Sequence, residues 1–277
     1  MRVTMFWNRL LTNRVGIIGG VIILATVFIA ILAPWIATHD PLKIDIRYYA
    51  APPSSQFFFG TDEFGRDIFS RVIFGTRISL YISLLSVLFA SILGVVIGSI
   101  SGYYGGWIDE GIMRFMDAIM AFPAILLAIG IMAVIGGSIN GVIIALGVVY
   151  IPRFARIVRG SVLSLKEKEF VEASLAMGDS DLVIMFRHIL PNCTSPLIVQ
   201  STAALAYAIL AESTLSFLGL GAPPPSPSWG NILSDAKNFM IDNPLMTVFP
   251  GIAITFTVLG FNFFGDALRD VLDPRLK

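Results

Sequence analysis

One polar segment, with charged residues and a glycine, interrupts an otherwise apolar sequence. The segment spans residues 172–192 and reads EASLAMGDSDLVIMFRHILPN. Residues 165–177 contain no glycine or proline and are rich in helix formers, so we expect a short helix there. Gly178 is the residue type that ends a helix or lets two backbones approach closely. The carboxylate of Glu172 suits a charge-assisted contact, although a solvated connecting loop would also fit the pattern.

The other reactive side chains do not indicate a catalytic site. The sequence has one cysteine, Cys193, and two histidines, His39 and His188, which lie far apart. A disulfide within the chain is therefore impossible, and neither a Cys/His metal site nor a nucleophile with a matching base is indicated. No G-x-x-x-x-G-K-[ST] motif occurs, so the chain has no P-loop. We expect a non-enzymatic protein that binds no cofactor itself.

Composition points to a membrane protein. Of the 277 residues, 56% are hydrophobic and 14% are charged, against about 25% charged in an ordinary globular domain. The formal net charge is zero, which gives no reason to expect a nucleic-acid partner. The polar segment must therefore be positioned by membrane helices.

Charge-free runs long enough to cross the bilayer predict six transmembrane helices. The first run covers residues 15–38, and the second covers residues 78–108. Two more helices are expected within residues 109–160, divided by the GGSIN turn at residues 136–140. The fifth covers residues 193–219 and the sixth covers residues 243–265. The expected fold is an all-α polytopic membrane protein.

The distribution of lysine and arginine predicts the orientation, because these residues are retained in the cytoplasm. A cytoplasmic N-terminus places most of the nineteen basic residues inside: Arg2, Arg9, Arg14, Arg114, Arg153, Arg156, Arg159, Lys166, Lys168, Arg187, Arg269, Arg275 and Lys277. Both termini and the loop at residues 161–191 are then cytoplasmic. The first apolar run exceeds the roughly 7–15 residues of a signal-peptide core, so a retained anchor is favoured over a cleaved signal.

Two further segments lie on the opposite side of the membrane in this topology. Residues 39–77 have mixed charge, and residues 218–244 are rich in proline, so both are expected to form ordered caps or docking surfaces. We divide the chain into residues 1–74, an N-terminal transmembrane helix with its extracytoplasmic segment, and residues 75–277, a five-helix transmembrane domain that contains the loop at residues 161–191.

The polar segment resembles the cytoplasmic coupling motif of ABC-importer permease subunits. That motif is Glu-Ala-Ala, three residues, Gly, nine residues, Ile, one residue, Leu-Pro, and the matching residues here are Glu172, Ala173, Gly178, Leu190 and Pro191. Two positions depart from it: Ser174 replaces the second alanine, and His188 replaces the isoleucine. Serine keeps the volume small, and a half-exposed surface position would tolerate histidine.

Three other stretches narrow the resemblance to the C-type permease subunit of dipeptide, oligopeptide and nickel importers. They are GTDEFGRDIFSR at residues 60–71, SFLGLGAPPPSPSWG at residues 216–230 and FNFFGDALRDVLDPRL at residues 261–276. This resemblance implies a type I ABC importer transmembrane domain in the bacterial inner membrane. It also implies a second, homologous permease, two ATPase subunits that bind ATP and magnesium, and an extracytoplasmic substrate-binding protein.

The resemblance further implies that the short helix sits in a groove of an ATPase subunit. Ala173 and Ser174 would let its backbone approach that partner, Glu172 would contact a cation or a helix N-terminus, and Gly178 would set the exit angle. We expect Glu172→Ala to weaken docking and Gly178→Val to uncouple transport from hydrolysis. Glu212, an acid within the fifth span, is a candidate to line the outer part of the transport path and meet a peptide amine.

Two alternatives remain at the level of the sequence. The first is nickel or a metal chelate as cargo in the same family, although the sequence shows no cluster of His, Cys or Met ligands. The second is a secondary transporter or channel that works without ATP, which would be expected to show inverted repeats, broken helices and buried ionisable residues. No convincing repeat is visible, and a coupling loop would have no purpose in such a protein.

Overall fold

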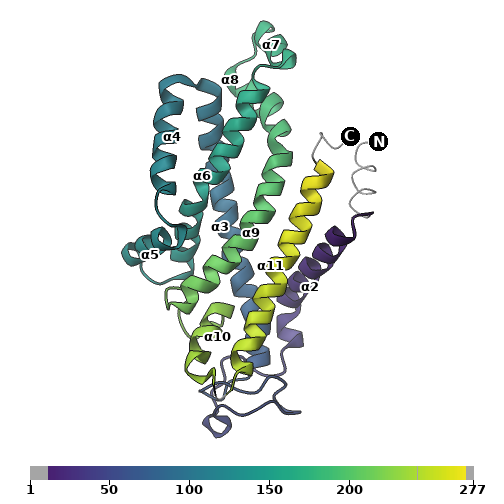
Figure 1. Ribbon diagram of the computed structural model, residues 1–277, viewed down its shortest axis with the longest axis vertical. Helices are drawn as coiled ribbons and strands as arrows, with labels where there is room; N and C mark the ends of the chain where they lie inside the picture. Colours follow the sequence, from purple (N-terminus) through teal and green to yellow (C-terminus); the bar gives the residue numbers. More distant parts are fainter. Residues whose placement is uncertain (1–11, 242, 273–277) are drawn as a thin grey trace.

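The computed structural model describes residues 12–241 and 243–272, and these residues fold into an elongated bundle of helices (Figure 1). Within these residues there is no β-strand, and a single isolated bridge joins Thr61 and Asp67. The prediction of an all-α membrane protein is confirmed. Arg2, Arg9, Arg275 and Lys277, which entered the orientation argument, lie outside the described residues.

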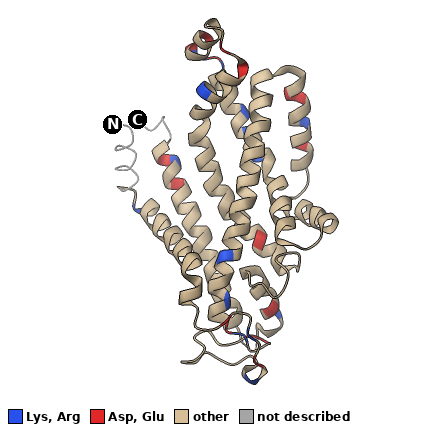
Figure 2. Cartoon of the chain, turned by 180° about the vertical axis from the view of Figure 1, so that it is seen from behind, with Lys and Arg blue, Asp and Glu red and all other residues tan. Residues whose placement is uncertain are grey.

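Five helices are long and apolar enough to cross a membrane, and a bent pair provides a sixth candidate span within the described residues. The five are α2 (Arg14–Ile36), α3 (Ile68–Tyr104), α6 (Ile139–Leu165), α9 (Thr194–Phe217) with the short turns before it, and α11 (Leu245–Leu272). The bent pair is α4 (Gly106–Met120) and α5 (Ala124–Ile135). In Figure 2 the Lys, Arg, Asp and Glu residues lie mainly towards the two ends of the bundle.

The third predicted span differs most from the structure. We expected one helix from about residue 109 to the GGSIN turn. The structure instead has two helices, α4 and α5, which meet at an angle of 92°. The cause is Pro123, which lacks an amide hydrogen and disfavours helical geometry at the residue before it. The next helix, α6, begins at Ile139, within the GGSIN stretch that was predicted to divide the two helices, with Ser138 as its N-cap.

The second span begins ten residues earlier than predicted. Asp67 caps α3 by accepting a hydrogen bond from the Ser70 amide at 3.0 Å, so helix starts at Ile68. The charges at Arg71 and Arg77 made the first turns of this helix look like part of a loop. At the other end, α3 stops at Gly105, whose φ of +65° suits glycine.

Close backbone contact between α3 and α6 forms the centre of the bundle. Gly94, Gly98 and Gly102 lie four residues apart on α3, where a Cβ atom would meet α6 at 2.3, 2.4 and 2.9 Å respectively. Small residues at this spacing let membrane helices approach closely. The helix that leads to the polar loop is therefore held firmly against α3.

A similar contact attaches the first span to the last. A Cβ atom at Gly19 would lie 2.5 Å from the Phe264 amide nitrogen, so α2 and α11 pack backbone to backbone. The start of α2 and the end of α11 lie towards the same end of the bundle as the polar loop (Figure 1). This placement agrees with both termini sharing one side of the membrane with that loop.

The opposite end of the bundle carries an ordered cap, which we define as residues 37–67 and 218–241. It contains the short 3-10 helices η1 (Ile46–Tyr48) and η4 (Lys237–Phe239) and the helix α10 (Trp229–Ala236). Trp229 is buried and donates its indole hydrogen to the Val72 carbonyl at 3.1 Å, which fastens α10 to α3. The two segments predicted to be ordered rather than membrane-spanning thus form one layer.

Candidate functional site

The predicted polar helix exists and stands at the end of the bundle opposite the cap (Figure 1). It is α7 (Glu169–Ala176), which begins four residues later than expected because Leu165 is the last residue of α6. Lys168 has extended backbone geometry and separates the two helices. We call residues 166–193 the coupling loop, after the motif that it contains.

Gly178 ends this helix and turns the chain. Its φ of +85° lies in the left-handed region, its amide donates to the Leu175 carbonyl at 3.0 Å, and the Asp179 amide donates to the Ser174 carbonyl at 3.2 Å. These are the paired bonds of a helix C-cap that uses a left-handed residue. A Cβ atom at Gly178 would meet nothing within 4 Å, so glycine is needed here for its backbone conformation and not for close packing.

Ser174 lies on the inner side of the helix. Its side chain is buried, and its hydroxyl donates to the Asp179 carboxylate across the turn. The Ser174 side chain faces the loop's own interior, and the expectation that a small residue here lets a partner approach the helix backbone stays a prediction. The observed contribution of Ser174 is to hold the Gly178 turn closed.

The outer side of the coupling loop is apolar. Glu172 and Ala173 are exposed, as a docking role requires, and the same loop carries large exposed apolar side chains. We call this set the apolar ridge: Phe170, Leu175, Met177, Leu182 and Phe186. The exposed fraction of these side chains ranges from 42% at Phe170 to 75% at Met177. Several large exposed apolar side chains on one polar loop are typical of a protein–protein interface.

The coupling loop is held to the bundle from beneath. Val171 is buried and packs in a cluster that includes Val158 and Val162 of α6. The Tyr103 hydroxyl at the end of α3 donates to the Asp181 carboxylate at 2.9 Å. The loop is therefore attached to both helices of the central pair.

The return half of the loop leads into α9 through a continuous but irregular helical path. It comprises α8 (Asp181–Val183), the π-helix η2 (Ile184–Ile189) and the 3-10 helix η3 (Leu190–Cys193). Leu190 is half-buried and packs against the cluster below the loop, whereas Pro191 is exposed. His188 is half-buried, with Nε2 3.9 Å from the Asp179 carboxylate, as expected for a tolerated surface position.

Arginines of α6 fix the neighbouring helix α4. The Arg159 guanidinium makes two hydrogen bonds to the Asp109 carboxylate, both at 2.5 Å, and Arg156 pairs with Asp117. Bidentate arginine–carboxylate pairs add geometric specificity as well as energy. The sequence alone did not reveal the acidic partners of these arginines.

Glu212 is enclosed at the other end of α9. Its side chain is fully buried, and the Ser216 hydroxyl donates to Oε1 at 2.8 Å. Hydroxyl groups of Ser79 on α3 and Ser228 before α10 also bond to it. This carboxyl group joins α3, α9 and the cap in the present arrangement. Its predicted contact with cargo stays a prediction.

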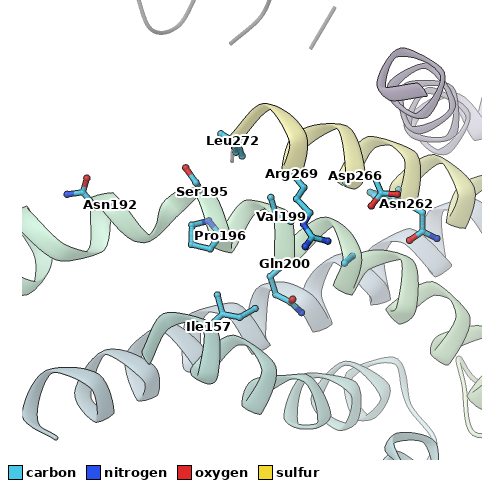
Figure 3. Close-up of a pocket in the computed structure, with 13 residues that line it drawn as sticks. Ile157, Asn192, Ser195, Pro196, Val199, Gln200, Asn262, Asp266, Arg269 and Leu272 are labelled. Atoms are coloured by element: carbon cyan, nitrogen blue, oxygen red, sulfur yellow. The ribbon is translucent and has the colours of Figure 1, made fainter. Parts of the chain in front are cut away.

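A cleft with both apolar and polar side chains in its walls opens between α9 and α11, on the side of the molecule that carries the coupling loop (Figure 3). It has a volume of about 690 Å³. Gln200 contributes from α9, and Asn262, Asp266 and Arg269 contribute from successive turns of α11. Sequence reasoning missed these residues, although their spacing of four and three places them on one helix face.

Comparison with known sequences identifies the family. Residues 94–277 match the family described as "Binding-protein-dependent transport system inner membrane component", and residues 3–53 match the "N-terminal TM domain of oligopeptide transport permease C". The chain belongs to this family of inner-membrane transport components. It is a multi-pass inner-membrane protein, and the resemblance seen in its motifs is confirmed.

Relatives match over nearly the whole chain. A Brucella abortus protein, provisionally named as a peptide transport system permease, is 51% identical over 98% of this chain and 91% of its own length. The dipeptide transport system permease protein DppC of Alkalihalophilus pseudofirmus is 45% identical over 98% of this chain and 89% of its own. The glutathione transport system permease protein GsiD of Pectobacterium atrosepticum is 43% identical over 98% and 91%.

The fold also matches a solved transporter. An inward-facing structure of the MetNI methionine ABC transporter aligns with a TM-score of 0.60 and 18% sequence identity. The alignment covers 73% of this chain and 96% of that one. At this identity the likeness establishes the fold alone, which is that of an ABC importer transmembrane domain.

Proposed function

We propose that this protein is the membrane-spanning permease subunit of an ATP-driven, binding-protein-dependent importer of di- or oligopeptides. It would form half of the translocation pathway, with a homologous permease forming the other half. The names of its relatives, which refer to peptide, dipeptide and glutathione transport, support the cargo class. The cleft between α9 and α11, on the side of the coupling loop, would line part of this pathway.

The observation that carries the proposal is a rigid loop with an exposed apolar surface. The apolar ridge and Glu172 face outward, while Val171 and Ser174 are buried beneath them. Burying apolar side chains in a partner's groove supplies most of the binding energy, at about 25 cal/mol per Å². The charge of Glu172 would help to fix the orientation of α7 in that groove.

This geometry explains how a motor protein could move the bundle. A lever must be attached at both ends, and the coupling loop continues into α6 on one side and α9 on the other. The loop is also attached to α3, because Tyr103 of α3 donates a hydrogen bond to Asp181 and the glycines of α3 pack closely against α6. Closure of the ATPase pair would therefore displace α3, α6 and α9 together instead of bending the loop.

The chain's partners follow from the same reasoning. ATP and magnesium would be bound by two ATPase subunits, and this chain would be a non-catalytic subunit. The coupling loop and both termini would lie in the cytoplasm. The cap would then face the extracytoplasmic side, where a substrate-binding protein delivers cargo.

Nickel is the weaker cargo candidate. The relatives compared above are named for peptide, dipeptide and glutathione transport. Within residues 12–241 and 243–272, no group of three or more His, Cys, Asp or Glu side chains is arranged to hold a metal ion. Peptide is therefore the cargo that we propose.

Reconstitution tests this function directly. The permease pair, its ATPases and its binding protein are placed in proteoliposomes, and uptake of labelled dipeptide, oligopeptide and nickel is measured together with ATP hydrolysis. We expect peptide-stimulated hydrolysis and peptide uptake. ATP-dependent uptake of nickel without peptide uptake would overturn the cargo assignment.

The role of Glu172 is tested in the same assembly. Replacing Glu172 by alanine removes the charge without altering the buried side of α7, so ATPase binding is expected to weaken roughly tenfold, corresponding to about 1.4 kcal/mol. Glu167→Ala serves as a matched control, because Glu167 is exposed in the turn before α7 and lies outside the motif. Equal ATPase affinity in wild type and Glu172→Ala would contradict the proposed contact.

A further inference from the structure

The cleft between α9 and α11 is large enough for a small molecule. Its volume of about 690 Å³ lies within the roughly 300–1,000 Å³ of small-molecule sites in proteins. It opens on the side of the molecule that carries the coupling loop, which faces the cytoplasm in the proposed topology. A ligand in this cleft would therefore stand at the cytoplasmic exit of the pathway.

Two opposite charges of α11 line the cleft, and both are open to solvent. Asp266 and Arg269 are exposed, and neither forms an ion pair within residues 12–241 and 243–272. They lie three residues apart, so they project from the same face of the helix. In Figure 3 the Arg269 side chain extends from α11 towards Gln200 of α9. A carboxylate and a guanidinium are thus both available to a ligand.

The arginines of the neighbouring helix α6 show the contrast. Arg159 bonds to Asp109 and Arg156 pairs with Asp117, so each of them has a carboxylate from α4. Asp266 and Arg269 could neutralise each other, because oppositely charged residues three apart on a helix can pair. This pair is open in the structure, so a ligand that carries both an ammonium and a carboxylate group could meet both charges at once.

The rest of the cleft wall distinguishes it from a helix end that merely carries solvated charges. Asn262 lies one turn before Asp266 on α11, and Gln200 contributes from α9. A side-chain amide both donates and accepts hydrogen bonds, so it can pair with the N–H or the C=O of a peptide bond. Ile157 and Phe261 add apolar wall, which would accept apolar side chains without selecting a particular one.

We propose that this cleft binds a short peptide by its two free termini, with the ammonium group at Asp266 and the carboxylate at Arg269. The inference rests on the proposed function, because it gives the imported cargo its last site on this chain before release into the cytoplasm. Exposed charges hold a ligand weakly, since water and salt compete for them. Weak binding suits a site from which cargo must leave.

A zwitterionic lipid headgroup, such as that of phosphatidylethanolamine, also carries an ammonium group beside an anion. The amides of Gln200 and Asn262 favour the peptide, because this headgroup has no amide bond to pair with them. The binding experiment therefore starts in a bilayer without phosphatidylethanolamine.

Calorimetric titration tests the site in the assembled permease pair and ATPases, without nucleotide or binding protein, in nanodiscs of phosphatidylcholine and phosphatidylglycerol. The probes are Ala-Ala, its N-acetylated form, which keeps only the carboxylate, and its C-terminal amide, which keeps only the ammonium. Each is titrated into the millimolar range. We expect saturable binding of Ala-Ala and weaker binding of each blocked form, by about tenfold for each lost charge pair.

Substitutions assign each end of the peptide to one residue. Arg269→Gln should weaken binding of Ala-Ala about tenfold and leave binding of the C-terminal amide unchanged, because that probe has no carboxylate. Asp266→Asn should weaken binding of Ala-Ala and leave binding of the N-acetylated form unchanged. Arg269→Lys keeps the charge and should retain most of the affinity. Asp270→Asn is the matched control, because Asp270 is an exposed acid of α11 outside the cleft wall, and it should change no affinity.

Several results would overturn the inference. They are no saturable binding of Ala-Ala, equal affinities for the free and blocked probes, or an unchanged affinity for Ala-Ala in Arg269→Gln. Loss of Ala-Ala binding when phosphatidylethanolamine is added to the nanodiscs would assign the cleft to a lipid headgroup instead. Uptake measured with the binding protein and ATP separates the two proposals: peptide uptake without binding at the cleft refutes this site alone, whereas absent peptide uptake refutes the proposed function.

Discussion

Substitution of Gly178 provides a sharp test of the lever, because the structure separates backbone strain from steric contact at this position. The φ of +85° is disfavoured for residues with a side chain, while a Cβ atom would find open space. Holding such a residue in a sparsely populated conformation costs about 1–3 kcal/mol. A β-branched residue lies at the upper end of this range, and asparagine lies at the lower end.

The magnitude follows from this strain. Gly178→Val at about 2 kcal/mol would reduce the population of the native turn, relative to relaxed alternatives, by roughly 30-fold. The relaxed turn breaks the bonds from the Gly178 and Asp179 amides, so the apolar ridge loses its fixed angle to the bundle. We expect Gly178→Val to hydrolyse ATP while importing much less peptide per ATP. Gly178→Asn should stay close to wild type.

The assay is the ratio of labelled dipeptide imported to ATP hydrolysed in proteoliposomes with saturating binding protein. Both variants are compared at equal amounts of assembled complex. If Gly178→Val keeps the wild-type ratio, or if the asparagine variant loses as much as the valine variant, the turn geometry does not transmit force and the reasoning fails.

Two further predictions concern the attachments of the lever and the cap. Tyr103→Phe removes the hydrogen bond to Asp181, at a cost of about 1 kcal/mol. Amide hydrogen exchange in residues 181–189 should therefore accelerate about fivefold, while exchange in α10 stays unchanged. Equal protection of residues 181–189 in wild type and Tyr103→Phe would contradict the attachment. Asp235→Asn leaves two buried guanidinium groups, Arg66 and Arg71, to share the single carboxylate of Asp62, so the purified protein should lose about 3 kcal/mol of stability and melt several degrees lower. Glu110→Gln, in an exposed pair, should change little, and equal melting temperatures of Asp235→Asn and wild type would refute this ion-pair network.

The spans and the coupling loop could be predicted from sequence because they depend on local signals. Long apolar runs mark membrane helices, and the glycine at position 178 marked the end of α7. The motif residues also pointed to Glu172 and Ala173, which the structure places on the outer surface. Basic residues at helix ends gave a topology that agrees with the loop and the helix ends lying together.

Features that depend on distant contacts were not visible in the sequence. The inward direction of Ser174 follows from its bond to Asp179 across a turn, and the enclosure of Glu212 follows from serines on two other elements. The ten residues before residue 78 include the charged Arg71 and Arg77, and they join α3 because Arg71 finds acidic partners up to 164 positions away. Only the folded chain brings these groups together.

The central claim, that the apolar ridge is the surface gripped by the ATPase, is tested most directly by photo-crosslinking in the assembled transporter. A photoreactive amino acid replaces Met177, which is 75% exposed on the coupling loop, and in a matched control it replaces Ile46, which is 74% exposed in the cap. The account predicts a crosslink from position 177 to an ATPase subunit and none from position 46. Absence of an ATPase crosslink at position 177, or a crosslink to the ATPase from the cap, would contradict it.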